Sequence, residues 1–313
     1  MTVTKELEDS LRYLASDIAL SAIDADAYWP KWNGPWWQML LIHEIGETKR
    51  IPAPAIERLV RKMNEYPVKI FPIHPEDMPE GVDPFRGTMC HCQLGNVYQV
   101  LAEWGVDVDT ELPWMRPWFL RYQMSDGGMN CDNEAYLVKH ETPSSMVGMI
   151  SVFEAVLKYT PRAFTPEEAA FLAKGAGFLI SRELRLGSAT VYNASERKSA
   201  EEWVNLCFPR FYLYDVLRGL SALLLWREKT GGSVPASAIS SVVSFLKEKF
   251  PDGQVQIGRL IYDKAKTFSP SDSGGWVRGP ASAFPLLEKV SPIGEVSPWL
   301  SAKWAEAKRL SRT

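Results

Sequence analysis

Similar apolar phrases recur about 60 residues apart along the chain, at Trp118-Phe119-Leu120, Gly177-Phe178-Leu179 and Ser244-Phe245-Leu246, with a weaker copy at Arg58-Leu59-Val60. A step of that length holds two helices and their connections. Helical periodicity dominates the sequence, and no convincing strand alternation interrupts it. The repeat therefore predicts an all-α chain built from helix pairs, with helical content well above half and no sheet larger than a hairpin.

Two series of helices are expected to alternate. The outer series has charged faces and often proline in its first turn, and its members are 6–23, 54–64, 113–122, 166–183, 235–250 and 298–310. The inner series is richer in Gly, Ser, Met and Tyr, and its members are 35–46, 92–105, 145–159, 210–228 and 277–290. On the inner series, Gly95, Gly148, Gly219 and Gly279 would allow close helix contacts. Alternation predicts an α/α toroid of about five to six helix pairs, with residues 1–313 as one domain.

Bulk properties exclude several partners. The formal net charge of −3 gives no electrostatic reason to expect nucleic acid or an anionic membrane. No apolar run approaches the roughly 20 residues of a membrane span, and the first residues lack a hydrophobic signal core. Four oddly spaced cysteines favour reduced thiols, so a cytoplasmic location is expected. The stretches 70–84 and 268–275 are expected to be loops.

Reactive side chains gather in one class of loop. All four cysteines, with His91 and His140, fall just before or at the start of inner helices, and in a ring such loops share one face. This placement predicts a single pocket. The candidate catalytic residues are His91, Cys131, Asp132 and Asp215, and the candidate substrate-binding residues are Trp36, Cys92, Tyr98, Tyr212, Tyr214 and Trp276.

The run Gln123-Met124-Ser125-Asp126-Gly127-Gly128-Met129-Asn130-Cys131 resembles the repeat of squalene and hopene cyclases and of protein prenyltransferase β subunits, with Met129 where Trp is usual. The segment 208–215 is similar to uncharacterised bacterial members of that group. The resemblance covers roughly residues 30–290 and implies a terpenoid cyclase/prenyltransferase-like toroid with a central cavity. It is specific for fold and poor for function.

The catalytic motifs of that superfamily are not reproduced. Its cyclases use an Asp-x-Asp-Asp acid, whereas Asp107-Val108-Asp109-Thr110 lacks the last Asp and is expected to form a helix exit and an N-cap. Its prenyltransferases bind zinc through an Asp-x-Cys pair and a distant His, whereas Cys131 and Asp132 are adjacent here.

Three interpretations of Cys90-His91-Cys92 stay open. As a zinc site it lacks the usual gap between Cys ligands and would need Cys131 or His140 to complete four ligands. As acid–base machinery, His91 would act with Cys131 and neighbouring Asp132 and Glu134. Alternatively, Cys90, Cys92 and Cys207 are small buried apolar residues and His91 is a capping donor.

Two further clusters also have two interpretations each. Asp215 could accept a proton beside Tyr212 and Tyr214, or could form an ordinary helix contact with Arg218. His43, inside the helix 35–46, is either a packing residue or one that reaches the cavity.

The predicted function is an enzyme that acts on a small, largely apolar and conceivably isoprenoid molecule by acid–base chemistry, as a lyase, isomerase or cyclase. No cofactor is expected apart from zinc, and no particular oligomeric state is predicted. One alternative is a glycan hydrolase or lyase, with paired carboxylates drawn from Asp132, Glu134, Glu202 and Asp215. The other is a non-catalytic binding or assembly protein. No P-loop, dinucleotide fingerprint or Gly-x-Ser-x-Gly elbow occurs.

Overall fold

The computed structural model describes residues 3–65, 90–262, 266–271 and 275–311. Helices make up 58% of the structure, and the only sheet in those residues is an antiparallel hairpin of β1 (Lys266–Pro270) and β2 (Trp276–Pro280). The expected all-α class is confirmed at this level. The Pro-rich stretch 70–84, with His74, lies outside the described residues.

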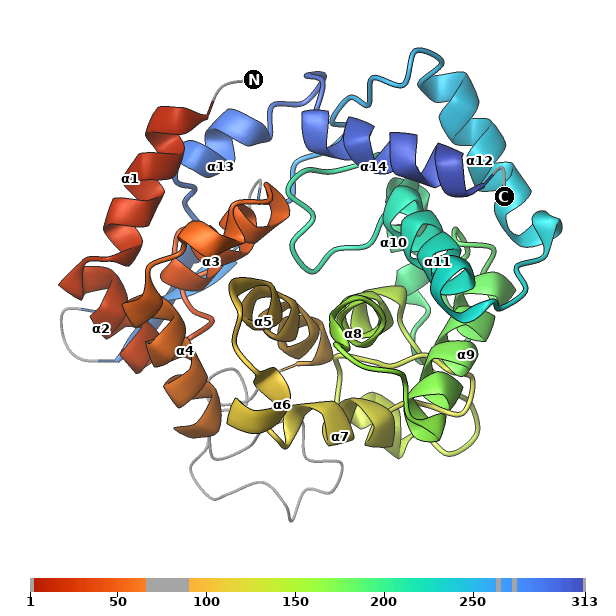
Figure 1. Cartoon of the computed structure of the whole chain (residues 1–313), viewed down its shortest axis with the longest axis horizontal. Coiled ribbons are helices and arrows are strands. Elements are labelled where there is room, and N and C mark those ends of the chain that lie inside the picture. Colours follow the sequence, from red (N-terminus) through yellow and green to blue (C-terminus); the bar gives the residue numbers. More distant parts are fainter. Residues whose placement is uncertain (1–2, 66–89, 263–265, 272–274, 312–313) are drawn as a thin grey trace.

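Among the helices towards the middle of the molecule in Figure 1, four contact one another in a row. They are α3 (Pro35–Glu44), α5 (His91–Trp104), α8 (Met146–Tyr159) and α11 (Val216–Thr230). Helix α5 packs along α8, and it also contacts α3, while α8 contacts α11. Nearly every residue of α5 and α8 is buried, as is typical of helices that are covered on all sides.

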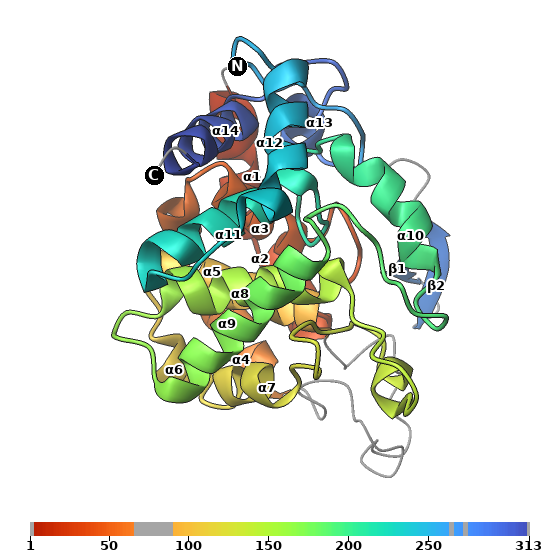
Figure 2. The same cartoon turned by 90° about the vertical axis from the view of Figure 1, so that its right-hand side faces the viewer.

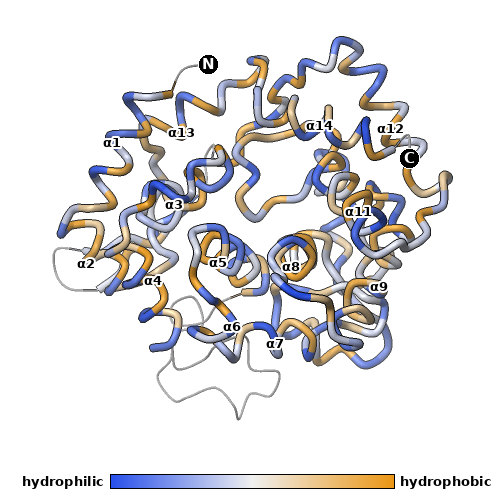
Figure 3. Tube along the Cα trace, in the orientation of Figure 1, coloured by the Kyte–Doolittle hydropathy of each residue, from blue (hydrophilic) through white to orange (hydrophobic). Residues whose placement is uncertain are grey.

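The other helices surround these four. Around the edge of Figure 1 lie α1 (Thr4–Leu14), α2 (Asp17–Ala25), α4 (Ala53–Glu65), α6 (Val108–Glu111), α7 (Met115–Arg121), α9 (Pro166–Ser181) and α12 (Ala236–Lys249). Short helix α13 (Pro285–Val290) packs on α1, and α14 (Pro298–Leu310) packs on α11. Several peripheral helices alternate hydrophilic and hydrophobic stretches along their turns in Figure 3. Each can therefore bury one side against the inner helices.

Side-chain caps set where several helices begin. Thr165 and Glu168 form a capping box at the start of α9, and Ser145 caps α8. Asp107, expected at a helix exit, caps α6 by accepting from the amide of Thr110, whereas Asp109, expected as the N-cap, lies within α6. Asp215 caps α11 in the same way, by accepting from the amide of Arg218 at 2.8 Å.

Three expected helices differ in the structure. The segment 6–23 is divided into α1 and α2, because Ser16 adopts an extended backbone and caps α2. The helix expected over 210–228 begins only at Val216. The segment 277–290 is strand β2 followed by α13, and β2 pairs with part of the expected loop 268–275, so that Phe268 lies opposite Arg278. Prolines at 280 and 285 interrupt any continuous helix there.

The buried apolar side chains form one cluster that extends from Leu7 to Leu310. Among the helices that the structure describes, none has the length and hydropathy needed to cross a membrane. Figure 2 shows the hairpin and α10 (Ser195–Ala200) on one side of the molecule and α14 on the opposite side. The cysteine cluster and the cavity lined by α14, both described below, lie at opposite ends of the inner helices.

Candidate functional site

Three cysteines from two distant segments converge near the hairpin side. The Sγ atoms of Cys90, Cys92 and Cys131 all lie within 4.8 Å of one another, and those of Cys90 and Cys92 are 2.9 Å apart. All four cysteines of the chain are free thiols. In the part of the chain that the structure describes, this is the one group of three or more His, Cys, Asp or Glu side chains placed to hold a metal ion.

Helix α5 and the loop before α8 position the thiols. Cys90 is the N-cap residue of α5, with an extended backbone, and Cys92 lies in the first turn. Cys131 follows Asn130, whose side-chain amide donates to the carbonyl of Pro143 at 2.5 Å. Gly148 lets this loop lie against α8, since a Cβ there would be 2.7 Å from the Met129 carbonyl oxygen.

His91 holds this loop rather than joining the thiols. Its side chain is fully buried, and Nδ1 lies 2.7 Å from the carbonyl oxygen of Asn130, the residue before Cys131. The Tyr136 hydroxyl lies 3.3 Å from the same nitrogen. Burial lowers the pKa of His91 to about 4, although the Asn130 carbonyl opposes this shift. His91 is therefore neutral near pH 7, and its geometry suits a positioning residue.

A lysine that lies among four aromatic rings interacts electrostatically with the thiols. The Lys31 ammonium lies 5.0 Å from the ring centroid of Tyr212 and 5.2 Å from that of Tyr28, and Trp29 and Trp32 lie within 5.6 Å. It donates to the Tyr212 hydroxyl at 3.3 Å. Burial lowers the pKa of Lys31, and the charges of the three cysteines oppose that shift. The ammonium is therefore held by aromatic faces and by the thiol cluster.

The three thiols differ in their acidity. Hydrogen bonds from Cys131 and Cys92 hold the pKa of Cys90 well below its usual range, and Lys31 adds to this effect. The same hydrogen bonds raise the pKa of Cys131 and of Cys92, together with burial. Cys90 is thus the most acidic thiol of the cluster.

Asp132 and Tyr98 form contacts away from the thiols. The exposed Asp132 carboxylate accepts from the Tyr192 hydroxyl at 2.7 Å and from the amide of Glu134 at 3.1 Å. The Tyr98 hydroxyl donates to Asp109 at 3.1 Å and accepts from Arg116. Both side chains therefore have local structural partners.

The remaining candidate residues are distributed around the site. Tyr212 reaches Lys31, whereas the buried Tyr214 hydroxyl donates to the carbonyl of Leu184 at 2.8 Å. Asp215 is completely buried and serves as a helix cap. Trp36 is buried in the first turn of α3, and Trp276 lies in β2. Of the predicted set, Cys92, Cys131 and Tyr212 come together.

Some residues of the site had a signal in the sequence that was not used. The sequence pattern predicts Cys90 as a zinc ligand or a packing residue and does not predict Lys31 as part of the site. Lys31 is the single charge within Tyr28-Trp29-Pro30-Lys31-Trp32, directly before an inner helix. A lone cation in an aromatic run is a candidate for a cation–π site. His140 does not complete the thiol cluster, because its side chain is 81% exposed beside Glu141.

The acidity difference predicts which thiol reacts first in the metal-free protein. Iodoacetamide near pH 7 is expected to modify Cys90 faster than Cys131, and Cys207 to remain unmodified in the folded state. Cys90 is partly exposed and favoured as a thiolate, whereas burial raises the pKa of the inaccessible Cys207 to about 12. Time-resolved peptide mass spectrometry measures this order. Faster labelling of Cys207 than of Cys90 would contradict it.

Comparison with known proteins adds no relative: no protein-family model, no curated protein and no solved structure matches the chain.

Proposed function

We propose that the chain binds one Zn²⁺ through Cys90, Cys92 and Cys131, and that this centre acts on a small, largely apolar substrate. The observation that carries the proposal is the convergence of three Sγ atoms within 4.8 Å, from segments about 40 residues apart. Thiolates are the ligands that zinc and other soft ions prefer. Packing alone does not require three thiols to meet at one point.

The spacing of the thiols supports this proposal. Zn–S bonds of about 2.3 Å in a tetrahedral arrangement place the sulfurs roughly 3.8 Å apart. No two of the three sulfurs are more than 4.8 Å apart, and the Cys90 and Cys92 sulfurs, at 2.9 Å, would have to separate by about 0.9 Å to reach that value. Small side-chain rotations are therefore enough to form the site.

The charge balance also supports it. One Zn²⁺ with three thiolates carries a net charge of −1, and a buried net charge is costly without a counterion. The Lys31 ammonium would serve as that counterion, since the cysteines raise its pKa electrostatically against the effect of burial. His91 fixes the loop that carries Cys131, in the manner of outer residues that orient metal ligands.

We propose that the fourth coordination position of this zinc is open to water or substrate. Structural zinc has four protein ligands, whereas catalytic zinc keeps one position for water or substrate. No His, Asp or Glu among the described residues completes the thiol set. Zinc with an open position would act there as a Lewis acid. The rings of Tyr28, Trp29 and Tyr212 would provide an apolar wall for the substrate, and Lys31 a proton donor beside it.

We further infer that the fold is an α/α toroid with the chain as one domain, similar to the squalene cyclase and prenyltransferase β group. The support is the alternation of helices in Figure 1, where α4, α7, α9 and α12 lie outside α3, α5, α8 and α11. A single apolar cluster along the chain agrees with one domain. Reduced thiols at the site agree with the expected cytoplasmic location.

Zinc titration tests the proposal. Metal-free protein, kept reduced, is expected to bind one equivalent of Zn²⁺ in competition with a chromophoric chelator. Cys131→Ser is expected to weaken binding by at least about 100-fold, since loss of an outer-shell partner alone costs ~10–100-fold. The matched control is Cys207→Ala, because Cys207 is a buried cysteine outside the cluster. Unchanged affinity in Cys131→Ser would refute the proposal.

Cobalt substitution separates an open site from a closed one. The Co²⁺ form is expected to show thiolate-to-cobalt charge-transfer bands, which change when imidazole or a small thiol is added. A structural site with four protein ligands would give bands that do not respond. That second outcome would leave the metal site intact and contradict the catalytic role.

A further inference from the structure

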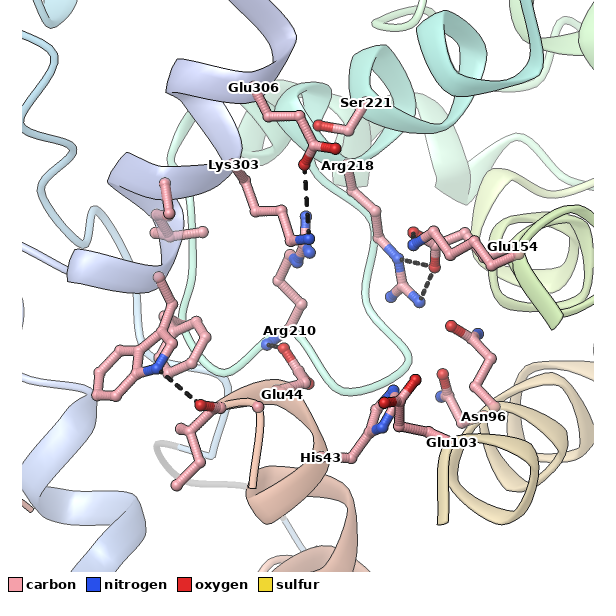
Figure 4. Close-up of a pocket in the computed structure, with 18 of the residues that line it drawn as sticks. His43, Glu44, Asn96, Glu103, Glu154, Arg210, Arg218, Ser221, Lys303 and Glu306 are labelled. Atoms are coloured by element: carbon pink, nitrogen blue, oxygen red, sulfur yellow. Dashed lines mark hydrogen bonds and ion pairs between the residues drawn. The ribbon is translucent and has the colours of Figure 1, made fainter. Parts of the chain in front are cut away.

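A polar cavity of about 510 Å³ lies at the opposite end of the inner helices from the thiols. It is lined by the C-terminal parts of α3, α5 and α8, by α11, by the segment before α11 and by α14, as Figure 4 shows. Its volume is in the range of small-molecule sites. Cys92 and Glu103 are roughly 17 Å apart along α5, so this cavity is separate from the proposed zinc centre.

Most carboxylates in the cavity wall are already paired. Glu154 is 3% exposed and accepts from Arg218 at 2.6 and 2.9 Å and from Lys158 at 2.9 Å. Arg218 also donates to the carbonyls of Phe211 and Leu213. These groups are saturated by one another and leave little capacity for a ligand.

Arg210, in contrast to Arg218, has a guanidinium without a partner among the described residues. Its backbone amide donates to Glu44 at 2.8 Å, which fixes the residue at the cavity wall. Its guanidinium makes no hydrogen bond or ion pair with any described residue, and Nη1 is buried. Burial lowers the pKa of Arg210, but the nearby carboxylates of Asp215, Glu154 and Glu44 raise it by more. The net effect is an increase, so the guanidinium stays charged. Arg210 as a whole is partly buried, and a buried guanidinium nitrogen is usually hydrogen-bonded.

Other groups around Arg210 also suit an anion. Figure 4 shows the Arg210 side chain reaching towards Lys303 of α14. Lys303 has only a weak partner, Glu306, at 3.8 Å on the same helix, with both side chains about half exposed. The Ser221 hydroxyl is a buried donor without a partner at the same wall. Trp299 and Phe208 stack at 4.7 Å and form an apolar wall.

We propose that this cavity binds a small organic anion whose oxyanion, a carboxylate or a phosphate, pairs with the Arg210 guanidinium. A planar guanidinium matches two oxygens of either group at once. Lys303 adds charge at the cavity mouth, Ser221 can donate to a further oxygen, and the body of the ligand packs on Trp299. The assignment goes beyond the zinc proposal and does not depend on it.

Calorimetric titration with three probes tests the assignment. Benzoate is expected to bind at one site, its neutral analogue benzamide to bind much more weakly, and inorganic phosphate to show which oxyanion is preferred. Arg210→Gln is expected to weaken binding of the preferred anion by about 10–100-fold, the loss of a charged hydrogen-bonded contact. Arg210→Lys keeps the charge and loses the paired geometry, so an intermediate loss is expected. The matched control is Arg309→Gln, because Arg309 is 62% exposed elsewhere on α14.

Thermal melting separates a binding role from a structural one. Without ligand, Arg210→Gln is expected to lower the melting temperature by a few degrees at most, because its side chain makes no hydrogen bond or ion pair with the described residues and loses only longer-range attraction to Asp215, Glu154 and Glu44. Benzoate without phosphate binding assigns a carboxylate, and the reverse assigns a phosphate. The proposal is overturned if neither anion binds, if benzamide binds as well as benzoate, or if both Arg210 variants bind like the control. Cys131→Ser should bind the anion normally, so failure of the zinc proposal is detected separately.

Discussion

Gly95→Ala is expected to lower the free energy of unfolding by about 3 kcal/mol, at the upper end of the range for overpacked cores. A Cβ at this position would lie 2.5 Å from the carbonyl carbon of Ser151 and from the amide nitrogen of Val152. These are backbone atoms of α8, so no rotamer change relieves the clash. Hydrogen bonds also cross this contact, from Ser151 to the Cys92 carbonyl and from Gln99 to the Ser151 carbonyl. The two helices would have to separate.

Gly177→Ala is the matched control for this substitution. Gly177 lies within α9, and a Cβ there would meet no atom within 4 Å. Alanine is expected to stabilise this helix by about 0.5–1 kcal/mol, since glycine is the poorer helix former. Urea unfolding, fitted for midpoint and slope, measures both variants. Equal stability of the two variants would show that α5 and α8 do not pack as closely as the structure has them.

The four glycines expected to allow close helix contacts have different surroundings. Gly95 lies against the backbone of α8, as expected. Gly148, in contrast, lies against the loop residues Met129 and Asn130, and Gly219 lies against the Tyr214 side chain just before its own helix. At Gly279 a Cβ would meet nothing within 4 Å, because that residue lies in β2. The pairing of β2 with β1 depends on segments that give no local strand signal, since strand formation depends strongly on tertiary context.

The thiol cluster could be anticipated in part. Cys92 and Cys131 were expected to share one face because both precede or begin inner helices, and the structure brings them together. The roles given to His91 and Asp132 depended on where their side chains point. The His91 side chain is directed by the carbonyl of Asn130, and the Asp132 side chain by the hydroxyl of Tyr192. Both partners are distant in the sequence. Sequence position alone does not contain that information.

The polar cavity was not predicted, because its charges lie within helices rather than in the loops before them. Glu154 and Arg218 belong to predominantly apolar inner helices and pair across the cavity. A charged residue within a helical sequence is normally assigned to the exposed face of the helix. It can be buried only when a residue of opposite charge on another helix pairs with it, and the sequence does not show that pairing. His43 lines this cavity, which lies at the opposite end of the inner helices from the pocket that the loops with Cys and His predict.

Glu154→Gln is expected to lower the free energy of unfolding by about 3–5 kcal/mol, the usual cost of removing one partner of a buried ion pair. The amide keeps the shape of the side chain but leaves Arg218, which is 4% exposed, without its carboxylate. Glu228→Gln is the matched control, because Glu228 is 45% exposed beside Arg309 at 3.3 Å. That surface pair is worth at most about 1 kcal/mol. Denaturant unfolding of the three proteins near pH 7 gives the comparison.

The difference in the free energy of unfolding between the unsubstituted protein and Glu154→Gln should depend on pH, and this dependence identifies the ion pair as the cause of the difference. Burial raises the pKa of Glu154, but Arg218 and Lys158 outweigh this effect and hold it well below its usual range. A carboxyl whose folded pKa is depressed stabilises the protein fully above its unfolded pKa of about 4.3, and this contribution is lost as the pH falls towards the folded value. The gap between the unsubstituted protein and Glu154→Gln should therefore be constant from about pH 6 to 8 and narrow below about pH 4. A gap that stays constant into acid would assign the loss to packing of the amide rather than to the missing charge.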